Sequence, residues 1–530
     1  MWRKSKQRVS SLAGDIPSEG GPLCIWYVGL AGLLLTSFAS QANEVPTGAE
    51  LNIRLTSPIA SYSSKAGDSV SAVLTVPIEV DGNPVLPSGI SLSGRVDAVR
   101  RVGWGFVHER ASLHLEFDTL VFPDAPPVRI ESRLVEIENA REVVDHAGTV
   151  RGIRATGNIT NSISSRLIHL PTWPLFPGDT ILLAYKLFAP GFPESEIHLP
   201  AGTDLRLQLT APATVPQLPD TRPPELDRQD VSELVRVMGT LPTRSRAGKQ
   251  RDLADFVNVV FLGSRAQIEI AFLAAGWSAS VPWSKGSLLR YFGALVSNQG
   301  YKTAPMSNQW LEGRPPDLTR QKSFDSFGKR HHVRLWKYPL DSPLGDEMWV
   351  ATATQDVGVL PSFRHHGFIH RVDSNIDRER EKVVSDLTFA GCVSASSLVE
   401  RPDFLRQGQT PSGEMMVTDG RFAVVQLRSC GQDVAPDRNL AALRTHPGRF
   451  QRVIRRQVLT VRNELLRGNP FWVVYDTANL VRHYRRLSPT AGRDSGIDKE
   501  PISGLGKDTI PHSGSPSEGG AETSSPEPHQ

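Results

Sequence analysis

Histidines, arginines and aspartates concentrate between positions 330 and 391, where five of the chain's 14 histidines fall. Imidazole and carboxylate groups can ligate a metal or move a proton, and a guanidinium fork matches a phosphate. We expect one shared pocket in this stretch. Its candidate site residues are His331, His332, Arg334, Asp356, His370, Asp373 and Arg380.

Two strands must position most of these residues. The runs RHHVRLWKYPL and EMWVATATQDVG flank a Pro- and Gly-containing turn at 341–346, which predicts a β-hairpin. A symmetric closure sets His331 and His332 opposite Asp356 and Gln355. The open end of the hairpin is where the loop with His365, His366 and His370 begins, so the histidines are expected to converge there.

A helix is predicted directly after that loop. Ser374 is a suitable N-cap, and Asp377, Glu379 and Glu381 fall where the helix dipole favours acids. We interpret these three acids as helix-starting residues on a solvated face. Asp373 lies just outside the cap and is not explained in this way, so it stays with the pocket.

A strand–turn–helix unit is predicted further upstream. Residues 257–262 form a continuous apolar run, typical of a buried strand. Ser264 and Gln267 then have the spacing of a capping box, and Gly276 is placed to end the helix.

The first half of the chain has a different pattern. Short alternating runs between Gly, Pro and Asp turns predict β-strands from residue 44 to 215. The motif Pro-x-Gly-x-x-Leu-x-Ile-x-Leu at 46–55 recurs as Pro-x-Gly-x-x-Leu-x-Leu-x-Leu at 200–209. We therefore expect an internally duplicated all-β barrel or sandwich. Its histidines are scattered singly, and no site is predicted there.

Composition predicts a multi-domain chain: an N-terminal all-β barrel or sandwich, an α+β domain and basic C-terminal helices. The predicted boundaries are 1–42 for a signal peptide or membrane anchor, 44–215 for the β-rich domain, 216–250 for a Pro-rich linker with a short helix, 251–430 for the α+β domain, 438–486 for Arg-rich amphipathic helices, and 487–530 for a disordered tail.

The N-terminus resembles an export signal. Residues 23–38 are apolar and uncharged, basic residues precede them, and Ser40-Gln41-Ala42 follows. This predicts a signal peptide cleaved after Ala42, or an uncleaved membrane anchor. Either places the bulk of the chain in the periplasm. Cys392 and Cys430 are the cysteines left after the leader; they form a bridge there or remain buried thiols.

Charge is unevenly distributed. The net charge of +3 is small, so no nucleic-acid partner is predicted. Residues 438–486, however, contain eleven arginines and no lysine. Apolar residues at helical spacing make this region amphipathic. It either binds an anionic membrane surface or an envelope protein, or packs on the domain with a solvated basic face.

Several motifs in order resemble the LssY C-terminal domain family, over roughly 255–430. They are VNVVFLGS, AAGW, GRPPDLTRQK, RHHVRLW, ATATQD-x-G and H-x-x-D-x-x-I-D-x-E-R. The family's polar positions fall on all seven candidate site residues, and Glu381 is a mild departure from the family pattern. The resemblance implies an envelope-associated bacterial protein, and such domains often accompany membrane phosphatase or secretion components. It implies no particular reaction.

Two functions are consistent with these features. The first is an exported binding or assembly module of the cell envelope with a His/Asp/Arg pocket. The alternative is a metal-assisted hydrolase acting on phosphoester or lipid-linked substrates. A purely structural role, with the histidines satisfied inside the fold, is also left open. The sequence has no HExxH zinc signature and no GxSxG nucleophile motif. No cofactor and no particular metal are predicted.

Overall fold

The computed structural model of this chain describes residues 43–104, 108–154, 194–247, 252–282, 300–341, 345–362, 367–401, 405–430 and 443–467, together with positions 284, 286–287, 290, 294, 474 and 478. The chain divides into two compact units, residues 1–476 and 477–530, and every element below lies in the first. The predicted leader, His365, His366 and the predicted disordered tail lie outside the described residues. The domain boundaries expected within the first unit remain predictions.

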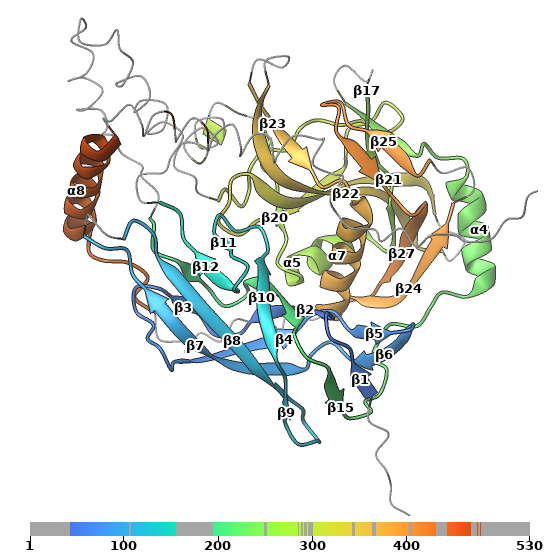
Figure 1. Ribbon diagram of the computed structural model, residues 1–530. Helices are drawn as coiled ribbons and strands as arrows, with labels where there is room; N and C mark the ends of the chain where they lie inside the picture. The colour runs from blue at the N-terminus through green and yellow to red at the C-terminus, as the bar shows by residue number, and fades with distance from the viewer. Residues whose placement is uncertain are drawn as a thin grey trace, which may run out of the picture. The chain divides into compact units, whose positions relative to one another are not determined.

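The described chain is mostly β-strand with few helices (Figure 1). Its first half forms a 9-stranded antiparallel sheet in the order β10-β14-β2-β4-β7-β8-β12-β11, with β9 against β8, which curls into a nearly closed, barrel-like sheet. Its strands are β2 (Glu50–Leu55), β4 (Ser69–Leu74), β7 (Ser91–Arg100), β8 (Ser112–Val121), β9 (Val128–Arg129), β10 (Ser132–Ile137), β11 (Val143–Val144), β12 (Thr149–Arg151) and β14 (Asp204–Leu209). Short pairs flank it: β1 (Asn43–Val45) with β15 (Ala213–Val215), β3 (Ile59–Ala60) with β13 (His198–Leu199), and β5 (Ile78–Val80) with β6 (Asn83–Leu86).

The two copies of the sequence repeat lie side by side as β2 and β14. They pair antiparallel, with Leu51 opposite Leu207. The Gly48 N–H donates to the Leu209 carbonyl, and the Gly202 N–H donates to the Leu55 carbonyl, so the two copies exchange equivalent bonds. Both glycines have a φ near +90°, a conformation that other residues rarely adopt.

Alternation along these two strands separates an apolar face from a charged one. The leucines and isoleucine of the repeat point into the barrel core and are almost fully buried. The residues between them, which include Asn52, Arg54, Asp204 and Arg206, face outward. This outward face does not meet water alone, because it lies against the second half of the chain.

The second half contains an 8-stranded sheet in the order β19-β20-β21-β22-β18-β27-β24, with β23 against β22. Its strands are β18 (Val259–Leu262), β19 (Ser278–Ala279), β20 (Leu318–Lys322), β21 (Lys329–Asp341), β22 (Glu347–Ser362), β23 (Gly367–Val372), β24 (Val393–Glu400) and β27 (Arg421–Leu427). Two short pairs accompany it: β16 (Arg244–Ala247) with β17 (Asp252–Phe256), and β25 (Gln407–Gln409) with β26 (Met415–Val417). The helices are α4 (Arg228–Met238), α5 (Arg265–Ala274), α7 (Ile376–Phe389) and α8 (Arg449–Arg467).

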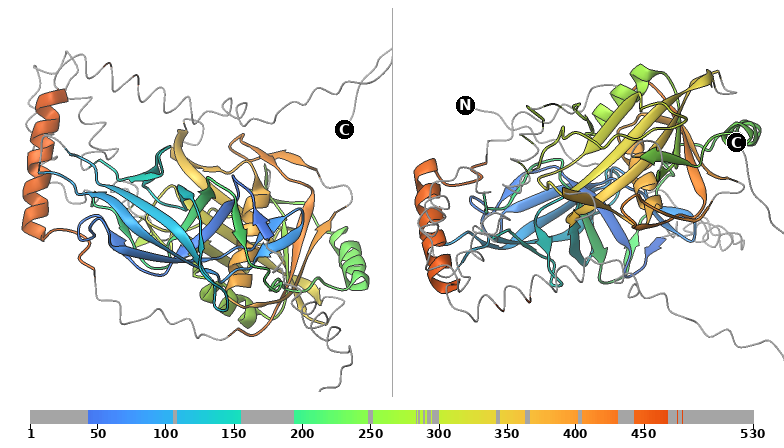
Figure 2. Two further views of the ribbon diagram at one scale, coloured as in Figure 1. Left: turned by 60° about the horizontal axis from the view of Figure 1, so that its bottom comes forward. Right: turned by 90° about the horizontal axis from the view of Figure 1, so that it is seen from above.

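Helices cover both faces of this sheet. Strand β18 is buried on both sides, since Val259 and Phe261 join the core under α5 and α7, whereas Val260 and Leu262 join the core under α4. Helix α7 therefore lies between the 8-stranded sheet and the outward face of the barrel (Figures 1 and 2). Helix α4 occupies part of the predicted linker and packs through Leu234 and Met238.

Local sequence signals for the helices are largely confirmed. Ser264 and Gln267 form a complete capping box, and Gly276 follows α5 with a φ of 82°. Helix α7 is capped by Asn375, so the prediction of Ser374 was wrong by one residue. Gly391 follows its end with a φ of 73°. Of the two alternatives for the cysteines, the structure has the Cys392–Cys430 disulfide.

Candidate functional site

The β21–β22 hairpin forms, and its register decides where the candidate site residues lie. His331 pairs with Gln355, and Arg330 pairs with Asp356. The predicted register was wrong by one residue, because an irregularity between Lys337 and Asp341 adds residues to β21 near the turn. Neighbouring residues of a strand point to opposite faces. His331 therefore faces α7, and His332 faces away from it.

His331 is buried between two carboxylates. Its Nδ1 lies 2.6 Å from Glu379 Oε2, and its Nε2 lies 3.7 Å from Glu138 Oε2. The contact with Glu379 is a hydrogen bond, whereas the contact with Glu138 is close enough only for an ion pair. Burial alone would lower the pKa of His331, but Glu379 and Glu138 outweigh it and raise the pKa to about 9. The imidazole is therefore protonated at neutral pH.

A network of buried ion pairs extends from this histidine. We call its members the interface network. Its basic members are Arg54, Lys322, His331 and Lys382, and its acidic members are Glu138, Asp204, Glu379 and Asp386. The barrel contributes three of these eight residues, and the second half of the chain contributes five. Four positive and four negative groups balance only when His331 is protonated.

Asp386 and Asp204 are the two acids that hold the cations together. Asp386 lies 3.1 Å from Arg54, 2.9 Å from Lys322 and 3.2 Å from Lys382, and it accepts a bond from Trp277 Nε1 at 3.0 Å. Burial opposes ionisation, yet Lys322 and Lys382 hold the pKa values of both aspartates below their usual range. Both acids are therefore ionised inside the interface.

A second buried network lies on the opposite face of the sheet. Arg330 Nε is 3.0 Å from Asp356 Oδ2, and His332 Nδ1 is 3.7 Å from the same oxygen. Arg334 Nη1 is 2.9 Å from Asp255 Oδ2. His332, Arg334 and Asp356 are thus brought together, but the sheet separates them from His331. The expectation of a single cavity holding both histidines is corrected, since strand alternation prevents it.

The other candidate residues have separate surroundings. Arg380 is 1% exposed and binds Asp377 and Asp419, which ties the start of α7 to the turn before β27. Asp373 accepts a hydrogen bond from the Asn375 backbone. His370 pairs with Val359 in the β23–β22 ladder, and its side chain lies outside the described part of the structure.

Two of the three α7 acids, Glu379 and Asp377, are not simply solvated residues as expected. Glu379 does stand in the first turn, but it is 2% exposed and binds His331. Its face of the helix is covered by the barrel, so it is not solvated. Asp377 accepts bonds from the Thr418 hydroxyl and the Asp419 N–H, so it too has a specific partner. The side chain of Glu381 is 67% exposed, as a solvated residue would be.

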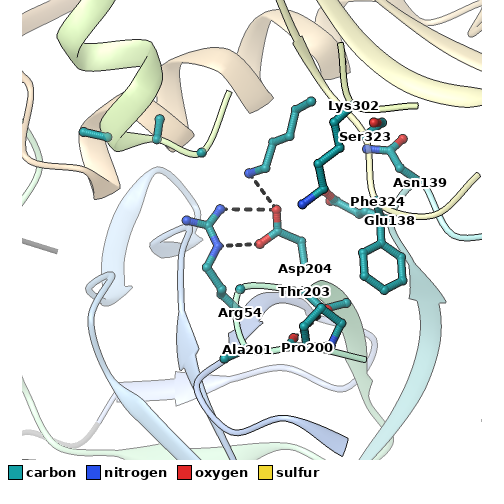
Figure 3. Close-up of a pocket in the computed structure, with 15 residues that line it drawn as sticks. Arg54, Glu138, Asn139, Pro200, Ala201, Thr203, Asp204, Lys302, Ser323 and Phe324 are labelled. Atoms are coloured by element: carbon teal, nitrogen blue, oxygen red, sulfur yellow. Dashed lines mark hydrogen bonds and ion pairs between the residues drawn. The ribbon is translucent and has the colours of Figure 1, made fainter. Parts of the chain in front are cut away.

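Two cavities flank the interface network, and Glu138 lines both. The smaller, of about 220 Å³, is lined by Arg54, Asp204, Lys302 and Phe324, among others (Figure 3). In it two of the guanidinium nitrogens of Arg54, Nε and Nη2, donate to the two carboxylate oxygens of Asp204.

The larger cavity, of about 440 Å³, lies between the barrel and α7. We call it the interface cavity. It brings together two candidate site residues, His331 and Asp373. Its other charged lining residues are Glu50, Glu136, Glu138, Arg206, Lys329, Arg378, Glu379, Glu381 and Lys382. Lys329 and Arg378 form no ion pair with any described residue.

Several residues of the interface network were not predicted from the sequence. Glu379, Lys382 and Asp386 have the i, i+3, i+7 spacing of one helix face, which was the available signal for a charged contact surface. Arg54 and Asp204 occupy outward positions of the repeat strands. Their partners lie 150 and 332 residues away along the chain, and nothing local in the sequence indicates them.

A metal site would need several nearby side chains with donor atoms for the ion. Among the residues that the structure describes, no group of three or more His, Cys, Asp or Glu side chains is placed to hold a metal ion. His331 in its protonated form has no free lone pair to offer. The described residues thus assemble ion pairs at these positions.

Residues 238–422 match the family model described as LssY C-terminus. The match confirms the resemblance and begins earlier than expected from the motifs. It contains the five interface-network residues of the second half, from Lys322 to Asp386. The barrel, with Arg54, Glu138 and Asp204, lies outside it. A search of curated proteins found no significant match.

The interface network predicts a large stability cost for removing its central acid. Asp386→Ala leaves Arg54, Lys322 and Lys382 with one shared aspartate, so we expect a loss of about 3–5 kcal/mol in the free energy of unfolding. Chemical denaturation measures it. Glu400→Ala removes the exposed pair with Arg406 and should change stability by less than about 1 kcal/mol. Equal effects of the two substitutions on stability would contradict the central role of Asp386 in the interface network.

The raised pKa of His331 predicts a pH-dependent contribution to stability. The contribution is complete below the ordinary pKa of 6.5 and is lost as the pH rises through about 9. It amounts to at most about 3 kcal/mol. Denaturation curves of the wild type should show this loss across that window, and His331→Gln should lack it. A wild type and variant with parallel pH profiles would mean that the imidazole does not titrate there.

Proposed function

We propose that this chain is an exported, cell-envelope-associated binding module whose ligand site is the interface cavity. The observation that carries the proposal is the cavity itself: about 440 Å³ falls within the range of ordinary small-molecule sites, roughly 300–1,000 Å³. Its walls come from two parts of the chain held together by buried ion pairs, so the site is preformed rather than assembled by the ligand.

The charged lining residues that have no ion-pair partner indicate which class of ligand the cavity would bind. Most lining acids and bases are paired with one another, as Arg206 is with Glu50 and Glu136. Lys329 and Arg378 have no ion-pair partner among the described residues, and neither does Asp373. Two cations beside one anion fit a zwitterionic molecule that carries a phosphate or carboxylate and an ammonium group. Phospho-ethanolamine compounds and amino acids have this chemistry.

Export is supported by two independent features. The apolar stretch at 23–38 has the length and flanks of a signal sequence. The Cys392–Cys430 disulfide is typical of proteins that fold in an oxidising compartment. The described helices include none long and apolar enough to cross a membrane.

The hydrolase alternative has less support from the geometry. Its candidate histidines lie on opposite faces of a sheet, and His331 is held as an imidazolium by Glu379. An imidazolium can donate a proton but cannot act as a general base. A binding role uses the same group as a fixed positive charge, without further requirements.

Binding can be tested with glycerophosphoethanolamine and, separately, glycerol 3-phosphate and ethanolamine, by titration calorimetry on the full chain. We expect the zwitterion to bind more tightly than either fragment. Lys329→Ala and Arg378→Ala should each weaken binding about tenfold, the loss of one charged contact. Lys329 is half-buried and Arg378 is exposed, and neither has an ion-pair partner among the described residues, so the fold should persist.

Lys302→Ala is the matched control, because Lys302 lines the smaller cavity on the other side of the interface network. It should leave the affinity unchanged. If Lys302→Ala weakens binding and the substitutions of Lys329 and Arg378 do not, the ligand site is not the interface cavity. Absence of binding by the whole panel, free amino acids included, would overturn the zwitterion assignment.

The disulfide tests the proposed compartment. After acid quenching of the cells, alkylation under denaturing conditions should find Cys392 and Cys430 protected, whereas a chain lacking residues 1–42 should yield two reactive thiols. Cys392→Ser with Cys430→Ser should lower the free energy of unfolding by about 3–4 kcal/mol, as expected for closing a segment of 38 residues. Reduced cysteines in the full-length chain inside cells would contradict export.

A further inference from the structure

A second contact between the two halves of the chain places two acids on one guanidinium group. Arg141 follows β10 on the barrel, and its Nε lies 3.0 Å from Glu142 Oε1 and 3.3 Å from Asp325 Oδ2. The Arg141 backbone N–H also donates to Asp325 Oδ1 at 2.9 Å. Asp325 belongs to the segment between β20 and β21, in the second half of the chain. One cation therefore serves two carboxyl groups that come from separate parts of the chain.

One buried oxygen of this acid pair lacks a hydrogen-bond donor. The Glu142 side chain is only 1% exposed, and no N–H or hydroxyl group of the described residues donates to its Oε2. Buried carboxylate oxygens are normally hydrogen-bonded, because leaving one unsatisfied is costly. The Asp325 carboxyl group is within hydrogen-bonding contact of Glu142, and it becomes a donor when it carries a proton. A proton on Asp325 therefore supplies the donor that Glu142 lacks.

The same proton balances the charge of the pair. With Asp325 protonated, Arg141 and Glu142 neutralise each other, whereas ionised Asp325 adds a second negative charge beside a single positive one. Burial and Glu142 raise the pKa of Asp325 to about 8, so the proton is present at neutral pH and leaves to the solvent above it. From β13, His198 also faces Glu142, but burial and nearby His446 lower the pKa of His198 and keep it neutral.

The acid pair lies at the edge of the smaller cavity. Glu138 and Asn139 of the barrel line one side of this cavity, and residues 322–324 of the second half line the other (Figure 3). Both lining segments run directly into the acid pair. The Ser326 N–H donates to the Asn139 carbonyl at 3.3 Å, which is a further hydrogen bond between the two segments. The contact between the acids therefore holds two walls of the cavity together.

We propose that Glu142 and Asp325 form a proton-operated latch at the edge of the smaller cavity. With one proton on the pair, the latch is closed and the two segments are held together. Loss of the proton leaves two carboxylates that repel each other, so the segments separate and the edge of the cavity opens as the pH rises above neutral. The opening is local, because the lysine–aspartate pairs of the interface network still join the two halves. This inference does not depend on the ligand of the interface cavity.

Amide hydrogen exchange on the full chain tests the latch. The Arg141 and Ser326 N–H groups donate across the contact, so their exchange reports its opening. After correction for the intrinsic exchange rate at each pH, we expect their protection to fall at least about tenfold from about pH 7 to about pH 9. In Asp325→Asn the amide N–H group donates to Glu142 at every pH. Protection in this variant should therefore stay constant, and Glu142→Gln should behave in the same way.

Asp145→Asn is the matched control, because Asp145 is another barrel acid paired with an arginine, at 2.8 Å from Arg151. It should keep the fall in protection seen in the wild type. His331→Gln should keep it too, which separates the latch from the titration of the interface network. Constant protection in the wild type, or the same fall in Asp325→Asn, overturns the proposal. So does a fall that disappears in His331→Gln, because the imidazole would then control the opening. Thermal melting checks that each variant is folded.

Discussion

Burying charge is costly unless every charge is paired, and this constraint governs how the two halves of the chain fit together. The barrel contributes Arg54, Glu138 and Asp204 to the interface network, a net charge of −1. The LssY C-terminus region contributes Lys322, His331, Glu379, Lys382 and Asp386, a net charge of +1 with His331 protonated. Neither half neutralises its own buried groups. Burial of these charged groups therefore requires the two halves together.

The ion pairs at that junction support the proposed binding role of the neighbouring cavity. Lys382 is held by Glu138 and Asp204 of the barrel, and Glu379 is held by His331, so both belong to the wall of the cavity. Lys329 and Arg378 also line the cavity and have no ion-pair partner among the described residues. This division between structural and available charges could not be drawn from residue types alone, because all of them are ordinary lysines, arginines and acids.

Sequence reasoning succeeded where the signal was local and failed where it depended on facing or distance. The capping box of α5, the hairpin and the duplicated strands follow from neighbouring residues, and the structure has each of them. His331 and His332 were expected in one pocket because they are neighbours in the sequence. In a strand, however, neighbouring side chains point to opposite faces of the sheet. Glu379 both stands in the first turn of α7 and pairs with the distant His331. Only its place at the helix start can be recognised from the sequence. The LssY motifs located the region but not its contact with the barrel.

The duplicated strands also affect how the molecule is assembled in time. Strand β2 pairs with β14 about 150 positions later, and β1 pairs with β15 about 170 positions later. At roughly 5–20 residues per second of synthesis, the first strand stays without its partner for roughly 8–30 seconds. During that interval its unpaired backbone N–H and C=O groups can pair with another chain. Dependence on a chaperone that shields nascent strands is the expected consequence, and it should be greater for this barrel than for a domain closed by local hairpins.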